Sequence, residues 1–124
     1  MRSSWAKEFP CINEEEISRF ARLMQDENPL HHDDAIAKKA GLHGIIAPGV
    51  MISGYASAAI AEEVPCVKVT RLEMTFKNPL YAGSLPSVFC SVLQRRKSLV
   101  RLALSIKNGA EDIAEGTCLL LLPQ

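Results

Sequence analysis

The sequence predicts an α+β domain in which a curved antiparallel sheet wraps around one central helix. Helical patterns fill the chain up to residue 63, and alternating strand patterns with turn residues between them fill the rest of the chain. The segment 48–63 is also rich in Gly, Ala and Ser, which is typical of a helix approached closely on most of its sides. A chain of 124 residues is expected to form a single domain over residues 1–124.

The first helix is expected to begin after Asn13, whose side chain can cap it, and Glu16 follows three residues later as in a capping box. Apolar residues then recur at helical spacing, at Ile17, Phe20, Ala21 and Met24. The helix cannot continue far past Asn28, because Pro29 disfavours a helical conformation for the residue before it. Residues 26–31 are therefore expected to run from a helix end into a loop.

Two more helical segments are expected before the strands. A short one begins near Asp33 or Asp34 and stops at Gly41. The central helix runs from Pro48 to Glu63, since proline suits the first helical position, where its missing N–H is no loss. The small residues of this helix predict that it is buried rather than exposed at the surface.

Four strands are expected, at residues 67–76, 87–94, 99–106 and 113–122, and Asn108-Gly109 is a strong hairpin signal between the last two. In the first strand the apolar positions change parity between Val69 and Leu72, which predicts a bulge or a strong twist. Helices followed by antiparallel strands, with a small-residue helix to fill the curved sheet, are the order that a hot-dog fold requires.

Composition and the N-terminal sequence argue against nucleic-acid-binding, secreted and membrane-spanning proteins. Fourteen basic residues balance fourteen acidic ones, so no strong field is expected to hold nucleic acid or an anionic membrane. The N-terminus lacks the apolar core of a signal peptide, and no apolar run approaches the ~18 residues of a spanning helix. The cysteines form no C-x-x-C pair, which favours reduced thiols. A cytoplasmic protein without nucleic-acid or membrane partners is expected.

Residues 26–35 read DENPLHHDDA and raise three possibilities: a metal site, a solvated loop or a catalytic pair. Adjacent histidines on an extended chain point to opposite sides, whereas helical zinc pairs use i, i+4 spacing, so no metal is expected. Capping and solubility are the expected roles of the remaining polar residues of this stretch, which are Glu27, His32, Asp33 and Asp34.

Asp26 and His31 stand apart because of the residues around them. The run Asp26-Glu-Asn-Pro-Leu-His31, followed by Ile-Ile-Ala-Pro-Gly at 45–49, resembles the MaoC-like (R)-specific enoyl hydratase and dehydratase family, whose signature is D-x-N-P-[aliphatic]-H. The segment 74–83, MTFKNPLYAG, looks like that family's F-x-x-P-V-x-x-G-D segment. The resemblance covers nearly the whole chain and implies the hot-dog fold.

The resemblance implies that Asp26 and His31 hold one water, with Asp26 as general base and His31 orienting the water and sharing the proton. The reaction would be syn addition of water to an α,β-unsaturated acyl thioester, or the reverse loss of water. The backbone N–H of Gly49, at the start of the central helix, would stabilise the thioester oxygen, since a helix N-terminus favours negative charge. No metal or other cofactor is implied.

Four further residues are expected to contact the substrate or shape its pocket. Asn28 would fix the loop or touch the substrate, and Ser57 matches a position that lines the pocket in some relatives. Pro48 and Tyr55 complete this set. The sequence departs from the family pattern at two positions. Gln25 replaces the usual Gly or Ser before the aspartate, and Pro48 replaces the His of a His-Gly pair.

Two other functions remain open at this point. Another hot-dog enzyme, a thioesterase, would use a carboxylate to attack or activate water at the thioester carbonyl. A subunit that binds acyl thioesters without turnover would keep the fold and lose the chemistry. The resemblance implies acyl-CoA or acyl-carrier-protein thioesters as substrates. It also implies a homodimer, because a single hot-dog domain leaves one edge of its sheet uncovered.

Overall fold

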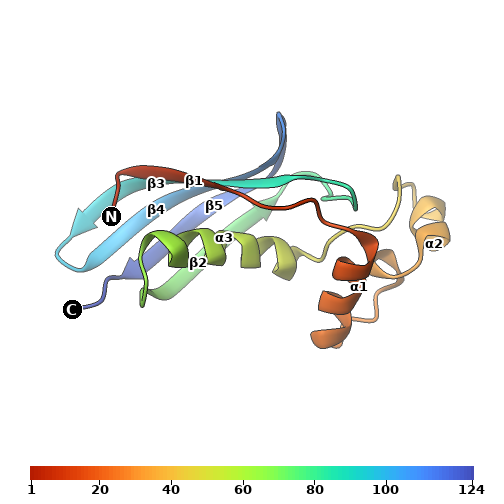
Figure 1. Ribbon diagram of the computed structural model, residues 1–124, viewed down its shortest axis with the longest axis horizontal. Coiled ribbons are helices and arrows are strands. Elements are labelled where there is room, and N and C mark those ends of the chain that lie inside the picture. The colour runs from red at the N-terminus through yellow and green to blue at the C-terminus, as the bar shows by residue number, and fades with distance from the viewer.

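The computed structural model describes residues 1–124, with four helical segments and five strands (Figure 1). In chain order these are β1 (Ser4–Glu8), α1 (Glu14–Leu23), the 3-10 helix η1 (Pro29–His31), α2 (Asp34–Lys39), α3 (Gly49–Glu63), β2 (Lys68–Phe76), β3 (Pro86–Arg96), β4 (Leu99–Asn108) and β5 (Glu111–Leu121). None of the helices is both long and apolar enough to cross a membrane.

All five strands form one antiparallel sheet in the order β1-β3-β4-β5-β2. The helix α3 lies along one face of the curved sheet, whereas α1 and α2 gather beyond one end of it (Figure 1). Both termini lie at the opposite end (Figure 1). This arrangement confirms the predicted α+β hot-dog fold.

The pairing of β2 with β5 contains the irregularity that the sequence predicts. Its register shifts between Val69 and Arg71, inside the interval where the apolar parity changes. Val69 pairs with Leu120 and Leu72 pairs with Cys118, and both partners on β5 are buried. The bulge therefore lets apolar residues on both sides of it face the core.

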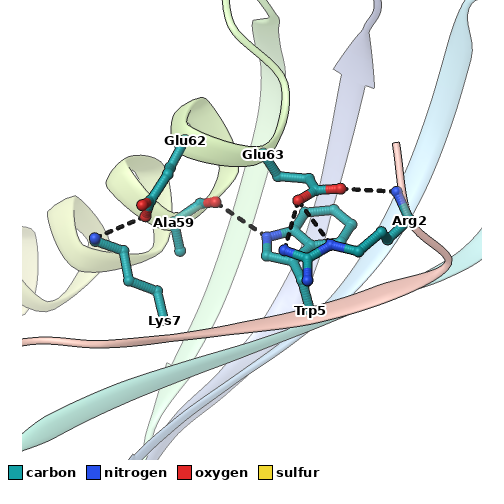
Figure 2. A network of polar contacts seen from close by, with 6 residues as sticks. All are labelled: Arg2, Trp5, Lys7, Ala59, Glu62 and Glu63. Atoms are coloured by element: carbon teal, nitrogen blue, oxygen red, sulfur yellow. Dashed lines mark hydrogen bonds and ion pairs between the residues drawn. The ribbon is translucent and has the colours of Figure 1, made fainter.

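The strand β1 was missed by the sequence prediction because only one of its five residues, Trp5, is buried. Its partners are distant in sequence: it pairs with β3, and the Trp5 indole N–H donates to the carbonyl of Ala59 on α3 at 3.0 Å. Arg2 holds Glu63 through three hydrogen bonds, as Figure 2 shows beside the Trp5 contact. These long-range contacts tie the N-terminal strand to the end of α3.

The central helix is buried on one side only. Its core-facing side chains pack in a cluster of 20 buried residues and comprise Ile52, Ala56, Ala59 and Ile60. On its other side Val50 is 64% exposed, and Gly54 and Ser57 are also exposed. The prediction of close approach on most sides is therefore wrong for one copy of the chain, because one sheet covers only one face.

The helix starts follow the predicted caps, with one correction. The Asn13 carboxamide oxygen accepts from the Glu16 N–H at 2.8 Å, and Asp33 accepts from the Ile36 N–H at 3.1 Å. The sequence prediction places Pro48 inside α3, but its ψ of 148° makes it the N-cap. Gly49 is therefore the first helical residue.

Candidate active site

A left-handed turn at Gln25 carries the chain out of α1. Gln25 has a φ of 59°, and the Asp26 N–H donates to the carbonyl of Ala21 at 2.8 Å. A residue with a Cβ pays roughly 1–2 kcal/mol for this conformation, whereas glycine adopts it freely. The geometry explains why glycine suits the position before the aspartate.

Replacing Gln25 with glycine is expected to raise the free energy of unfolding by about 0.5–1 kcal/mol, after part of the relieved strain is offset by the flexibility of glycine in the unfolded chain. Denaturant unfolding measures this change. The control is Met24→Gly, one residue earlier at a φ of −84°, which is expected to destabilise the chain. A loss of stability in Gln25→Gly would contradict the strain explanation.

The loop after Asp26 is held by its own side chains. The Asn28 N–H donates to Asp26 Oδ1 at 3.1 Å, and Asn28 Oδ1 accepts from the Leu30 N–H at 3.1 Å. Pro29 then opens η1. Asn28 is expected either to fix the loop or to touch the substrate, and these contacts show that it fixes the loop. They also occupy one carboxylate oxygen of Asp26 and leave Oδ2 for other partners.

His31 is buried at the end of η1 with its ring orientation fixed. Its Nδ1 lies 2.8 Å from the carbonyl oxygen of Ile46, and because a carbonyl only accepts, Nδ1 must carry the hydrogen. In the neutral ring, Nε2 is then an acceptor. The Ile46 N–H in turn donates to the carbonyl of Leu30 at 3.1 Å, which ties this loop to the segment before α3.

The free atoms of Asp26 and His31 face each other. Asp26 Oδ2 lies 3.5 Å from His31 Nε2, and the two side chains are 39% and 8% exposed. A carboxylate and a neutral Nε2 both present lone pairs, so neither can donate to the other. Two acceptors at this separation can together take both hydrogens of one water molecule.

Gly49 is linked to this pair through Ile46, whose carbonyl contacts the His31 ring. It lies three residues past Ile46, so its Cα is within about 11 Å of the Ile46 Cα. As the first residue of α3 it has no intrahelical acceptor for its N–H. A Cβ built on Gly49 would meet the Phe76 ring at 3.1 and 3.2 Å, so any other residue here requires the ring to shift by a few tenths of an ångström.

Replacing Gly49 with alanine is expected to slow about tenfold any reaction that uses this free N–H, because the new methyl group and the Phe76 ring cannot both keep their places beside it. The double variant Gly49→Ala/Phe76→Leu serves as the control, since the smaller side chain makes room for the new methyl group. Steady-state kinetics should show partial recovery in the double variant. Full activity in the single variant would contradict the close contact.

The other expected pocket residues divide between two sides of α3. Tyr55 packs edge-on against Phe9 with ring centroids 4.7 Å apart, and burial raises the pKa of its hydroxyl. Ser57 is exposed and shares a helix side with Val50, seven residues before it. Two residues along a helix turn by about 200°, so Tyr55 and Ser57 leave it in opposite directions and cannot line the same wall.

Sequence reasoning assigned His32 to solvent, and the structure corrects this. His32 is half-buried, with Nδ1 2.7 Å from Ser18 Oγ and Nε2 2.8 Å from the carbonyl oxygen of Asp26. Ser18 lies 14 residues earlier, on α1, so no local pattern could have revealed this contact. The two histidines thus bond to different backbone carbonyls.

Two of the thiols are unsuited to nucleophilic chemistry. All four cysteines are free, and burial raises the pKa of Cys90 to about 12 and that of Cys118 to about 11. Both therefore stay protonated at neutral pH. None of the five principal cavities is lined by Asp26 or His31.

Comparison with known proteins points to one family. The family model described as MaoC like domain matches residues 6–101, which include α1, the Asp26–His31 loop and α3. A mitochondrial 3-hydroxyacyl-[acyl-carrier-protein] dehydratase, FERN, of Solanum lycopersicum is 26% identical over 122 residues, covering 94% of this chain and 74% of its own. A 3-hydroxybutyryl-CoA dehydratase of Methylorubrum extorquens is 26% identical over 119 residues, covering 91% and 74%.

Among solved structures, the unliganded R-hydratase PhaJ1 of Pseudomonas aeruginosa superposes with a TM-score of 0.89 at 26% identity. The superposition covers 100% of this chain and 83% of that one. The family match spans most of the sequence and includes the loop that holds Asp26 against His31. The chain belongs to the MaoC like domain family.

Proposed function

We propose that this protein is an (R)-specific hydro-lyase that adds water to an α,β-unsaturated acyl thioester or removes it from a 3-hydroxyacyl thioester. The observation that carries the proposal is the pair of acceptors, Asp26 Oδ2 and His31 Nε2, at 3.5 Å. The names of the relatives support the substrate class, since they describe dehydratases of acyl-carrier-protein and CoA thioesters and an R-hydratase.

In the hydration direction, one water molecule donates one hydrogen to Asp26 and its other hydrogen to His31 Nε2. Asp26 removes the first proton while the water oxygen forms a bond to C3 of the substrate, and the C2–C3 π electrons move toward the thioester oxygen. The resulting enolate takes a proton at C2 from the Asp26–His31 pair on the same face. Water is thereby added without net change at either residue, and general acid–base catalysis of this kind contributes roughly 10²–10⁴ in rate.

The enolate oxygen needs a donor, and the Gly49 N–H is the group proposed for this role. It stands at the N-terminus of the 15-residue helix α3, where the aligned peptide dipoles favour negative charge. Loss of such a donor typically costs about 10²–10³ in rate in acyl-transfer enzymes. All the proposed steps use side chains and backbone of the chain itself, so no cofactor is required.

A panel of enoyl thioesters carried on CoA and on acyl carrier protein tests the proposal. The absorbance of crotonyl-CoA at the enoyl band should fall with enzyme, and chiral analysis should identify the (R)-3-hydroxy product. Release of free thiol without loss of the enoyl band would instead favour the thioesterase. Tight binding without turnover of any panel member would favour the acyl-binding subunit.

The proposed assembly is a homodimer joined through the edge strand β2. This strand ends the sheet, and its core-facing residues Val69 and Phe76 remain 41% and 49% exposed in one copy. Val50, on the open side of α3, adds a third uncovered apolar side chain. A second copy could cover all three and extend the sheet.

Sedimentation equilibrium is expected to show a dimer for the wild-type chain and a monomer for Val69→Lys, because an inward-pointing charge blocks edge pairing. Lys68→Ala, next to it on the solvent side of the same strand, is the control and should remain dimeric. A stable monomer of the wild-type chain would contradict the proposed assembly.

The proposed compartment is the cytoplasm, supported by the four free cysteines, since thiols stay reduced in that compartment. The name of the tomato relative places that protein in mitochondria. Fractionation of cells that express the full-length protein distinguishes the two compartments.

A further inference from the structure

The neighbouring rings of His31 and His32 are held in opposite tautomers. His31 Nδ1 faces the Ile46 carbonyl, so that nitrogen carries the hydrogen, whereas His32 Nε2 faces the Asp26 carbonyl and carries the hydrogen there. In the neutral ring the remaining nitrogen of His32, Nδ1, then accepts from the Ser18 hydroxyl at 2.7 Å. Each ring is therefore fixed by one carbonyl, and that of His32 also by a hydroxyl.

These contacts leave Asp26 with a single free polar atom. Its N–H donates to the Ala21 carbonyl at 2.8 Å, and its Oδ1 accepts from the Asn28 N–H at 3.1 Å. Its carbonyl oxygen accepts from His32 Nε2 at 2.8 Å. Only Oδ2 remains, and it is the atom that faces His31.

We propose that His32 is a positioning residue, which fixes the Asp26 peptide and thereby the distance from Asp26 Oδ2 to His31 Nε2. Ser18 assists by donating to Nδ1, which keeps the hydrogen of His32 on Nε2. The catalytic consequence rests on the hydro-lyase function proposed above. Position 32 lies just outside the D-x-N-P-[aliphatic]-H run, so the family signature assigns it no role.

The physical reason is the short loop between the two residues. Asp26 and His32 are six residues apart, and the ring closes this loop by bonding back to its first carbonyl. Without that bond the peptide between Asp26 and Glu27 can rotate, and the carboxylate moves with it. A misplacement of about 1 Å can cost about 10²-fold in rate.

Two substitutions at His32 separate positioning from packing. His32→Leu keeps an apolar body of similar size but lacks both polar atoms, so kcat should fall about 10- to 100-fold with KM nearly unchanged. His32→Gln can donate its amide N–H to the Asp26 carbonyl and accept from Ser18, so it should restore most of kcat. Loss of stability without loss of kcat in His32→Leu would overturn the inference.

Ser18→Ala provides a second, independent variant. Ser18→Ala should lower kcat by a smaller factor than His32→Leu. The double variant Ser18→Ala/His32→Leu should be no slower than His32→Leu alone, because both changes remove the same bridge. His43→Leu is the matched control: this exposed histidine lies edge-on to Tyr81, and its replacement should leave kcat unchanged. Independent, multiplicative losses from Ser18→Ala and His32→Leu would contradict the bridge.

Imidazole ¹⁵N NMR of the wild-type chain decides the inference without turnover. It should show His31 protonated at Nδ1 and His32 at Nε2, and the Nε2–H signal of His32 should broaden or average in Ser18→Ala. A His32 ring that averages between tautomers in the wild type would overturn the positioning role. Absence of wild-type turnover on every thioester, with both tautomers as expected, would refute the hydro-lyase function alone.

Discussion

Replacing Asp26 with asparagine is expected to lower kcat for enoyl-thioester hydration by about 10²–10⁴-fold. The amide oxygen can still accept from the Asn28 N–H, so the loop keeps its form. The amide NH₂ then takes the place of Oδ2 and donates to His31 Nε2, which occupies the acceptor that would hold water. The substitution is therefore expected to lower kcat and to leave the thermal unfolding midpoint nearly unchanged. Steady-state kinetics measures the first quantity and a thermal melt the second.

Glu27→Gln is the matched control for this loss. Glu27 is the next residue, it is exposed, and it makes no ion pair. Its replacement removes the same charge from the same loop and should leave kcat unchanged. Equal losses in the two variants would show that the loop's net charge, and not a base at position 26, determines the rate.

Replacing His31 with asparagine is expected to lower kcat by about 10²-fold or more while the chain remains folded. The asparagine Nδ2 lies near the place of the ring Nδ1, so it can still donate to the Ile46 carbonyl. The variant lacks Nε2, and with it the second acceptor for the water. The measurement is kcat with the thermal unfolding midpoint of the same preparation.

His31→Leu separates the catalytic from the structural contribution of this ring. Leucine removes both nitrogens and leaves the Ile46 carbonyl without its partner, which should cost about 1–3 kcal/mol in unfolding free energy. The asparagine variant should avoid most of that cost. Near wild-type kcat in His31→Asn would contradict the proposed role of Nε2.

Much of the fold could be predicted from local signals. Asn13 and Asp33 cap their helices as their positions suggest, and the parity change near Val69 marks a real bulge. These features depend on residues within one turn or one strand. In contrast, β1 depends on pairing with β3, far later in the chain, and on the Trp5 contact to Ala59, so its own five residues hardly indicate it.

The candidate site divides in the same way. Asp26 and His31 could be paired because one short motif resembles that of a known family, and the structure places Asp26 Oδ2 3.5 Å from His31 Nε2. The ring orientation could not be predicted, because it depends on the Ile46 carbonyl 15 residues away. The same holds for the contact of Gly49 with Phe76, since it joins a helix start to the end of a strand.

The most direct measurement compares crotonyl-CoA hydration by wild type, Asp26→Asn, His31→Asn and the double variant. If both residues act on one water, the double variant should be about as slow as the slower single variant, because either loss alone disables the unit. Equal rates in the wild type and the double variant would contradict the account, and so would losses that multiply as if the two residues acted separately.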